Sequence, residues 1–426
     1  MNSTHTKLAI EGGTPVRTAP WPSRYLGTSV MGEEELALLT EVVKTKLPFR
    51  DYGDGTPHMV NDFEDAAARY FKVPHALATA TGSGSYFCAM AGLGIGPGDE
   101  VILPSFSWYT DFNAPALLGA TPVFADIDTS ICLDLDDVEK KITPRTKAII
   151  LVYFQGGMPD IERLLAICKR NRVSLVEDVA QGCGGEYRGR KLGSLGAVAC
   201  FSFQQNKIMS TGDGGMLLTS DPLIYERAIR YHDLGFLRKV FKERLAQDLK
   251  VPDFMGCQFR MNEFTGAVAL AQLRKLDRSI LAITRKAHAL LRDRIKKNCP
   301  ALALRPVADE QGDPGIAFYM DLQTAERADW FSRALAAEGI VLGPSSGCTN
   351  LLHQPMVINR QQVHPALPPF GPGWPGEHVR YSAELCPQTD QILARMVCVA
   401  LGPQYDDTVV SDIGTAIEKV WNARPH

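Results

Sequence analysis

Short apolar runs alternate with helical patterns between residues 76 and 220 of the chain. Continuous apolar runs of this length are typical of strands that are buried on both faces of a sheet. We therefore expect strands at ALATAT (76–81), EVILP (100–104), TPVFAD (121–126), KAIILVYF (147–154), VSLVED (173–178), AVACFSF (197–203) and GGMLLTS (214–220). Between two of these runs, the segment 159–170 places apolar residues at i, i+3, i+4 and i+7, which predicts an amphipathic helix. This alternation predicts an α/β fold with a mostly parallel central sheet and helices on both of its faces.

The pattern changes after residue 260. Apolar residues recur at 3-4-3-4 spacing from Leu273 to Leu290, which predicts one long amphipathic helix that bridges two domains. Beyond it we expect a strand at 315–322, a helix at 324–338, a second strand at 340–343, an irregular proline-rich loop at 364–376 and a last helix that begins near Ser411. The chain is thus expected to have an N-terminal arm over residues 1–30 that packs over the surface, a large α/β domain over 31–275 and a smaller C-terminal α+β domain over 276–426.

Composition narrows the class of protein. At roughly 150 residues per domain, the 426 residues are enough for two or three domains. The formal charge of −3 gives no reason to expect a nucleic-acid or acidic-membrane partner. No apolar run approaches the ~20 residues of a transmembrane helix, and no signal peptide is recognised at the N-terminus. The ten cysteines form no Cys-x-x-Cys motif and no histidine pair has metal-ligand spacing, so we expect no metal site and a cytoplasmic location.

Ligands of open parallel sheets bind beyond the carboxyl ends of the strands, so the residues after each apolar run are the first candidates. The first run is followed by Thr-Gly-Ser-Gly-Ser at residues 81–85, where a helix is expected to begin. Small residues and free N–H groups at a helix N-terminus can hold a single phosphate, although an ordinary strand-to-helix turn also explains this segment. The segment matches neither a dinucleotide fingerprint nor a P-loop.

Further candidates follow the second, fifth and sixth runs. Trp108 falls in a turn, where its ring either stacks on a planar ligand or packs in the core. Asp178 and Glu177 end a strand, where a carboxylate needs a partner such as a protonated ring nitrogen, a turn that it caps or a metal. Lys207 lies between an apolar strand and a glycine-rich turn, where a lysine can act as a nucleophile or form a Schiff base rather than remain a solvated charge. Ser202, five residues earlier, can donate to a phosphate.

Together these features are the parts needed to hold pyridoxal phosphate. A phosphate cradle, an aromatic plate, an acidic residue and a confined lysine each match one chemical group of this cofactor. The lysine carries the aldehyde as an imine, and the aspartate keeps the pyridine nitrogen protonated so that the ring is an electron sink. The sequence therefore predicts a pyridoxal 5′-phosphate enzyme.

Five blocks of the sequence resemble the DegT/StrS-type sugar and cyclitol aminotransferases. The blocks are GLGIGPGDEVILPSFSW (92–108), GATPVFADID (119–128), VEDVAQGCGG (176–185), FSFQQNKIMSTGDGG (201–215) and FRMNEFTGAVALAQL (259–273). The resemblance covers roughly residues 8–300 with the motifs in order, and is weaker beyond them. It implies a pyridoxal-phosphate enzyme of fold type I that acts as an aminotransferase.

The resemblance also implies the roles of the catalytic residues. By this resemblance, Lys207 is the Schiff-base lysine, Asp178 is the partner of the pyridinium nitrogen, and Trp108 stacks on the ring. After the amino donor displaces it, Lys207 moves the proton as general base and then as general acid. Two half-reactions through one site imply ping-pong kinetics.

Five more residues match cofactor-binding positions of the family. Ser83, Gly84 and Ser202 fall at phosphate-binding positions, and Gln181 matches a side chain beside the cofactor ring. Gln258 stands where the family usually has an asparagine that reaches the phosphate of the neighbouring subunit. The resemblance therefore implies a homodimer with shared active sites.

Two branches of the family are the most similar to LAIEGGTPVR (8–17), FSFQQNK (201–207) and CPQTD (386–390). One branch aminates cyclitol ketones such as scyllo-inosose with glutamine, and the other is 3-amino-5-hydroxybenzoate synthase, which combines amination with dehydration. Both serve antibiotic pathways, and nucleotide-sugar aminotransferases share the core motifs. We expect transfer of an amino group from L-glutamine or L-glutamate to the ketone of a cyclitol or keto-sugar. A dehydratase or a 3-amino-5-hydroxybenzoate synthase-like enzyme is the alternative, although the related dehydratases typically carry histidine in place of Lys207.

Overall fold

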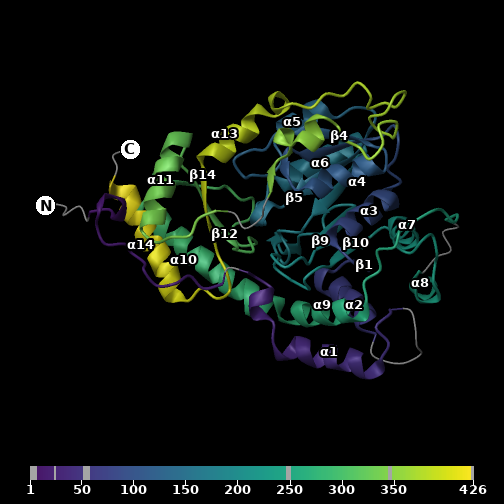
Figure 1. Ribbon diagram of the computed structural model, residues 1–426, viewed down its shortest axis with the longest axis horizontal. Coiled ribbons are helices and arrows are strands. Elements are labelled where there is room, and N and C mark those ends of the chain that lie inside the picture. Colours follow the sequence, from purple (N-terminus) through teal and green to yellow (C-terminus); the bar gives the residue numbers. More distant parts are fainter. Residues whose placement is uncertain (1–6, 24, 51–57, 246–250, 344–347, 424–426) are drawn as a thin grey trace.

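The computed structural model describes residues 7–23, 25–50, 58–245, 251–343 and 348–423 of the chain. Its largest feature is a seven-stranded sheet (Figure 1). In spatial order the strands are β1 (His75–Thr79), β10 (Gly215–Thr219), β9 (Val198–Ser202), β6 (Ser174–Asp178), β5 (Thr146–Val152), β2 (Glu100–Pro104) and β4 (Thr121–Ala125). Neighbouring strands are parallel except at β10, which is antiparallel to both β1 and β9. All seven predicted strands and the mostly parallel sheet are confirmed.

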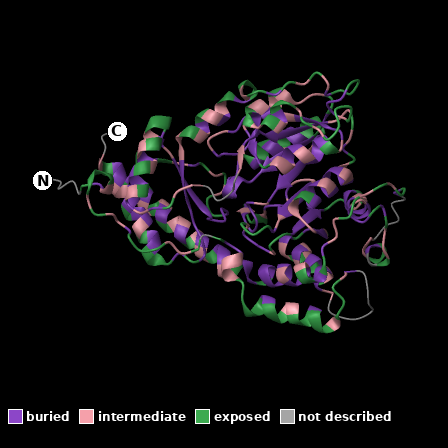
Figure 2. Cartoon of the chain, viewed as in Figure 1, coloured by how far each residue is buried: buried purple, intermediate pink, exposed green. Residues whose placement is uncertain are grey.

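Helices cover both faces of this sheet, as predicted. Side chains alternate between the faces, so that Ile149 and Leu151 of β5 pack into one apolar cluster and Ile150 packs into another. Helices that contribute to the first cluster are α2 (Met59–Phe71), α6 (Ile161–Asn171) and α9 (Glu263–Leu276). Helices that contribute to the second are α3 (Gly82–Leu93), α4 (Tyr109–Leu117) and α7 (Pro222–His232). The strands are mostly buried, whereas the helices expose their outer faces (Figure 2).

A smaller sheet lies in the C-terminal part of the chain. Its antiparallel strands are β11 (Ala303–Leu304), β12 (Ala317–Asp321) and β14 (Met396–Ala400). They share a third apolar cluster with α10 (Ala282–Asn298), α11 (Ala325–Ala337) and α14 (Asp407–Ala423). The predicted long helix is confirmed, because α9 continues through a π-helical segment at Asp277–Leu281 into α10. This helix crosses residue 275 without a break, and the division into domains at that residue stays a prediction.

The remaining α-helices and strands belong neither to these two sheets nor to the main helices of the three apolar clusters. They are α1 (Glu33–Thr45), β3 (Phe106–Ser107), α5 (Leu135–Lys141), β7 (Glu186–Tyr187), β8 (Arg190–Lys191), α8 (Lys239–Arg244), β13 (Thr349–Asn350), α12 (Pro355–Ile358) and α13 (Pro387–Arg395). The expected irregular loop at 364–376 consists of turns and bends. None of the helices in the described ranges has the length and the apolar character needed to cross a membrane.

Two predictions for the C-terminal part are wrong. Residues 340–343 form no strand, because Ile340 packs into the C-terminal apolar cluster from a loop and β14 takes the place beside β12. The last helix begins at Asp407, so Ser411 lies inside it rather than capping it. The carboxylate of Asp406 accepts the N–H of Val409 (2.9 Å), which identifies Asp406 as the cap.

The N-terminal arm lies against the C-terminal part and then turns toward the large sheet. Leu8 is buried in the C-terminal apolar cluster, and the Trp21 indole N–H donates to the carbonyl of Gly339 (2.7 Å). Arg17 forms an ion pair with Asp412 of α14 (2.8 Å), beside which the purple arm runs in Figure 1. Residues 1–6 and 24 of the predicted arm lie outside the described residues.

β6 ends with two adjacent carboxylates, Glu177 and Asp178, and the first of them has a structural role. Its side chain is fully buried and accepts the Tyr153 hydroxyl (2.7 Å) and the backbone N–H groups of Gly193 (2.8 Å), Leu195 (2.7 Å) and Gly196 (2.6 Å). Burial raises the pKa of this carboxyl, and these four hydrogen bonds oppose the rise. Glu177 therefore fixes the 193–196 turn against the sheet and leaves its neighbour Asp178 as the acidic candidate of the site.

Replacing Glu177 with alanine should strongly destabilise the fold. The substitution leaves the buried N–H groups of Gly193 and Leu195 and the partly buried N–H of Gly196 without an acceptor, and at about 1–3 kcal/mol for each unsatisfied group we expect a loss of about 3 kcal/mol or more in the free energy of unfolding. Urea denaturation measures this loss. Glu162→Ala is the matched control, because Glu162 is paired with Arg188 on the surface; a Glu177→Ala protein as stable as this control would contradict the assigned role.

Candidate active site

A cavity of about 470 Å³ opens at the carboxyl ends of β1, β2, β6 and β9. Six of the residues that the sequence identified as site candidates line it: Ser83, Trp108, Asp178, Gln181, Ser202 and Lys207. These residues lie up to 124 positions apart in the chain (207 − 83 = 124), and the sheet topology brings them together. Gly84 and Gln258 do not line the cavity.

The start of α3 forms the wall of the cavity that suits an anion. Thr81 caps the helix, because its hydroxyl accepts the N–H of Gly84 (2.9 Å). A Cβ at Gly82 would lie 2.7 Å from the Cβ of Ser202, so only glycine lets the helix start approach the end of β9 this closely. Ser83 and Ser202 place hydroxyl groups beside the helix N-terminus, where the helix dipole favours negative charge. Because its own N–H is bonded to Thr81, Gly84 shapes this wall instead of facing the cavity.

Asp178 supplies the negative charge of the site. Its carboxylate is buried at the end of β6 and accepts the N–H of Ala180 (2.8 Å). Burial raises the pKa of this carboxyl, whereas the positive charge of Lys207 opposes the rise. A cation placed in the cavity would therefore stabilise the ionised form of Asp178.

Lys207 lies on the loop that joins β9 to β10. Its backbone N–H donates to the carbonyl of Gln204 (2.9 Å), and its own carbonyl accepts the N–H of Gly27 (3.1 Å) from the N-terminal arm. Both ends of the loop are fixed, since Phe203 donates to Gly214 (2.9 Å) as the two strands separate. The ammonium group of Lys207 thus belongs to a loop held on two sides, which sets where the side chain can reach.

Trp108 and Gln181 complete the predicted set around the cavity. Trp108 is 47% exposed although it follows a buried strand, so its ring face is available to a planar ligand rather than packed in the core. The Gln181 amide nitrogen donates to the sulfur of Cys348 (3.3 Å), whereas its buried amide oxygen has no hydrogen-bond partner. Unpaired buried oxygens are rare in folded proteins, which points to a ligand that donates to this one.

Two further polar residues, which no sequence pattern indicated, line the same cavity. Asp111, in the first turn of α4, is fully buried, and burial together with the charge of Asp178 raises its pKa to about 8. One of its carboxyl oxygens bonds to the Ser107 hydroxyl. The hydroxyl of Tyr86, one turn into α3, is also buried in this cavity, and its hydrogen bonding opposes the rise in the pKa of both Asp111 and Asp178. Both residues lie in the first turns of helices that follow strands, so a search extended beyond the turns would have found them.

Gln258 lies on the surface of this protomer. Its segment pairs with Asp233, and the neighbouring apolar residues Leu234, Phe236 and Met255 are exposed, Met255 by 94%. The structure does not bring Gln258 to the cavity of its own chain. The predicted contact of Gln258 with a partner's phosphate therefore stays a prediction.

A group of potential metal ligands lies outside this cavity. Asp126, Asp137 and Cys386 have ligand atoms within 4.8 Å of one another. Lys141 already pairs with Asp137 (2.7 Å), and the N–H of Thr389 donates to Asp126 (2.7 Å). We assign no metal to these residues.

The residues around the cavity fit pyridoxal phosphate. The anion cradle suits its phosphate, the Trp108 ring suits its planar pyridine, and the buried Asp178 carboxylate suits a protonated ring nitrogen. The Gln181 amide oxygen has no partner in the protein, which leaves an acceptor for a ligand that donates a hydrogen bond. Lys207 supplies an amine in the same cavity.

Comparison with known proteins identifies the family of the chain. Residues 30–369 match the model of the DegT/DnrJ/EryC1/StrS aminotransferase family. The L-glutamine:2-deoxy-scyllo-inosose aminotransferase of Streptomyces kanamyceticus is 34% identical over 284 residues, which is 64% of each chain. The protein of the same name from Streptoalloteichus tenebrarius is 30% identical over 435 aligned residues, which is 97% of each chain. The crystal structure of 3-amino-5-hydroxybenzoic acid synthase superposes with a TM-score of 0.75 at 25% identity, covering 96% of this chain and 99% of that one. By its sequence and its fold, this chain is an aminotransferase that belongs to the DegT/DnrJ/EryC1/StrS family.

Proposed function

We propose that this enzyme transfers the amino group of L-glutamine or L-glutamate to the ketone of a cyclitol or keto-sugar, with pyridoxal phosphate as its cofactor. The observation that carries the proposal is the presence of Lys207, Asp178 and the anion cradle in one cavity. The relatives named above act on a cyclitol ketone with glutamine, which supports a polyhydroxylated acceptor and a role in antibiotic biosynthesis.

Each residue contributes one function to this chemistry. When bound, pyridoxal phosphate supplies an aldehyde that takes up the amine and a ring that accepts electrons. Lys207 would hold the aldehyde through Nζ, and the same atom would take up and return the proton of the substrate carbon. Asp178 would keep the ring nitrogen protonated through a charge-assisted hydrogen bond. Ser83 and Ser202 would hold the phosphate, and Gln181 and Trp108 would contact the ring.

Two half-reactions use this one cavity in turn. The donor leaves as a keto acid before the ketone enters, so Lys207 serves as base and then as acid for both substrates. Ping-pong kinetics follow from this order. A dehydratase is not favoured, because the family and the relatives reported above are aminotransferases and a lysine occupies position 207.

We propose a homodimer in which the surface around Gln258 faces the partner subunit. Leu234, Phe236 and Met255 expose apolar side chains beside Gln258, and an exposed apolar patch of this kind is typical of a protein interface. The family resemblance gives Gln258 a role at the partner's phosphate. None of the ten cysteines, all of which lie among the described residues, forms a disulfide, which supports a cytoplasmic location.

Lys207→Ala should reduce turnover by at least about 10³-fold, because the variant lacks both the cofactor-binding amine and the proton-transfer group. Steady-state assays measure this loss, and Lys44→Ala is a control at an exposed helix position. Borohydride reduction of the cofactor-loaded wild type, followed by peptide mapping, should find the cofactor on Lys207. A label on another lysine would refute the assignment.

Asp178→Asn should lower kcat by about 10- to 150-fold, which corresponds to the ~1.5–3 kcal/mol of a hydrogen bond to a charged group. The neutral amide cannot keep the ring nitrogen protonated, so the absorption spectrum of the bound cofactor should change as well. An Asp178→Asn enzyme with the wild-type spectrum and full activity would show that this carboxylate does not face the ring.

The acceptor is tested by a screen of donors and ketones. Glutamine and glutamate are each combined with inosose-type cyclitols and with nucleotide-linked keto-sugars, and both products are quantified. We expect equal amounts of keto acid and amine with at least one hydroxylated ketone. Release of keto acid without a matching amine, or loss of water from the acceptor, would favour a different reaction.

A further inference from the structure

Gln155 adopts an unusual backbone conformation next to the cavity. It follows β5 in a short 3₁₀ turn at Phe154–Gly156, with φ of 44° and ψ of 49°, and its side chain is only 2% exposed. A residue other than glycine rarely occupies this left-handed region, and such strain persists where the surrounding structure enforces it, often at functional sites. Contacts with the surrounding structure must therefore hold Gln155 in this conformation, and they fix the direction of its side chain.

Arg305 and Tyr319 of the C-terminal part hold Gln155 in place. The guanidinium of Arg305 donates to the carbonyls of Phe154 (3.0 Å) and Gln155 (3.0 Å), and it lies 4.7 Å from the centre of the Tyr319 ring. The Tyr319 hydroxyl donates to the side-chain oxygen of Gln155 (2.6 Å). Because this oxygen is satisfied, the amide nitrogen is the group left to bind elsewhere, and no acceptor for it is found among the described residues.

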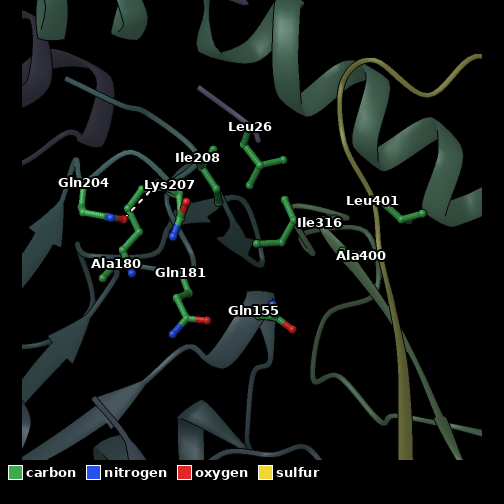
Figure 3. A pocket seen from close by; sticks show the side chains of 11 residues that line it. Leu26, Gln155, Ala180, Gln181, Gln204, Lys207, Ile208, Ile316, Ala400 and Leu401 are labelled. Carbon is green, nitrogen blue, oxygen red and sulfur yellow. Dashed lines mark hydrogen bonds between the residues drawn. The ribbon is translucent and has the colours of Figure 1, made fainter. Parts of the chain in front are cut away.

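The amide of Gln155 lines a recess of the active site together with Gln181 and Lys207. Figure 3 shows Gln155 and Gln181 along the lower side of this recess, and Ile316 to its right. The N–H of Gly156 donates to the carbonyl of Gln181 (3.1 Å), which joins the two segments. The Gln155 amide and the unpaired acceptor oxygen of Gln181 therefore belong to one recess.

This pairing of donor and acceptor distinguishes a hydroxyl group from a carboxylate. A hydroxyl accepts and donates at once, whereas an ionised carboxylate only accepts and leaves the Gln181 oxygen unpaired. Lys207 is the one charged residue among the described residues that line the recess, and apolar side chains such as Leu26 and Ile316 form other parts of its wall. The recess thus suits a neutral hydroxylated group.

We propose that Gln155 determines specificity for the ketone acceptor, because its amide nitrogen donates a hydrogen bond to a ring hydroxyl of that substrate. This inference rests on the proposed function and extends it, since it names the group by which the enzyme recognises its acceptor. Gln155 acts on binding and takes no part in proton transfer.

Gln155→Met and Gln155→Glu test the inference. Both keep the length of the side chain; methionine removes the amide, and glutamate keeps an oxygen for Tyr319 while it removes the donor. Each variant should raise the KM of the ketone about tenfold more than the KM of the amino donor. Gln323→Met is the matched control, because Gln323 also has a positive φ of 69° but lies at an exposed turn, so it should not alter either KM.

Mono-deoxy analogues of the accepted cyclitol identify the hydroxyl that is contacted. In a double-mutant cycle, wild type and Gln155→Met should have the same KM for one of these analogues. The variant and the analogue each remove the same hydrogen bond, so the two effects are not additive. Variants with wild-type melting temperature and cofactor spectrum but an unchanged KM for the ketone would overturn the inference and leave the proposed function intact. An equal rise in both KM values would also overturn it. Failure of the wild type to aminate any hydroxylated ketone would overturn the proposed function and this inference with it.

Discussion

The site depends on one constraint: a carboxylate that is buried at the end of a central strand needs partners for its charge. β6 ends with two adjacent carboxylates, Glu177 and Asp178, whose surroundings differ. Glu177 points into the structure and is satisfied by four donors, so it holds a turn. Asp178 faces the cavity, where the N–H of Ala180 and the charge of Lys207 stabilise its ionised form only in part. A cation in the cavity would stabilise the ionised carboxylate further. A cofactor with a protonated ring nitrogen offers such a cation.

The topology of the sheet places the other groups around this carboxylate. β1, β2, β6 and β9 run in the same direction, so their carboxyl ends meet at one edge. β10 is the exception, and its antiparallel return from β9 forms the loop that carries Lys207. Lys207 thereby has a strand on each side of its loop, and it follows β9, whereas Asp178 ends the adjacent strand β6.

Much of this arrangement follows from the sequence, because fully buried strands leave an apolar signature and ligands bind where such strands end. That rule found Trp108, Asp178 and Lys207. It did not find Asp111 or Tyr86, because both lie within helices. Gln155 directly follows the run at 147–154, but its conformation depends on contacts with Arg305 and Tyr319, more than 140 residues away. Local patterns also failed at 340–343, where an apolar run reads as a strand although β14 already occupies the neighbouring place. The contact of Gln258 depends on a second subunit, and one chain does not contain that information.

The N-terminal arm makes completion of the enzyme a late event in its synthesis. Arg17 and Trp21 leave the ribosome early, but their partners Asp412 and Gly339 belong to the last quarter of the chain. A few residues further on, the N–H of Gly27 donates to the carbonyl of Lys207. A growing chain can therefore form the large sheet, whose strands end by residue 219, well before its arm finds a docking place. The contacts that hold the other end of the arm, to Gly339 and Asp412, form only after these residues have been synthesised.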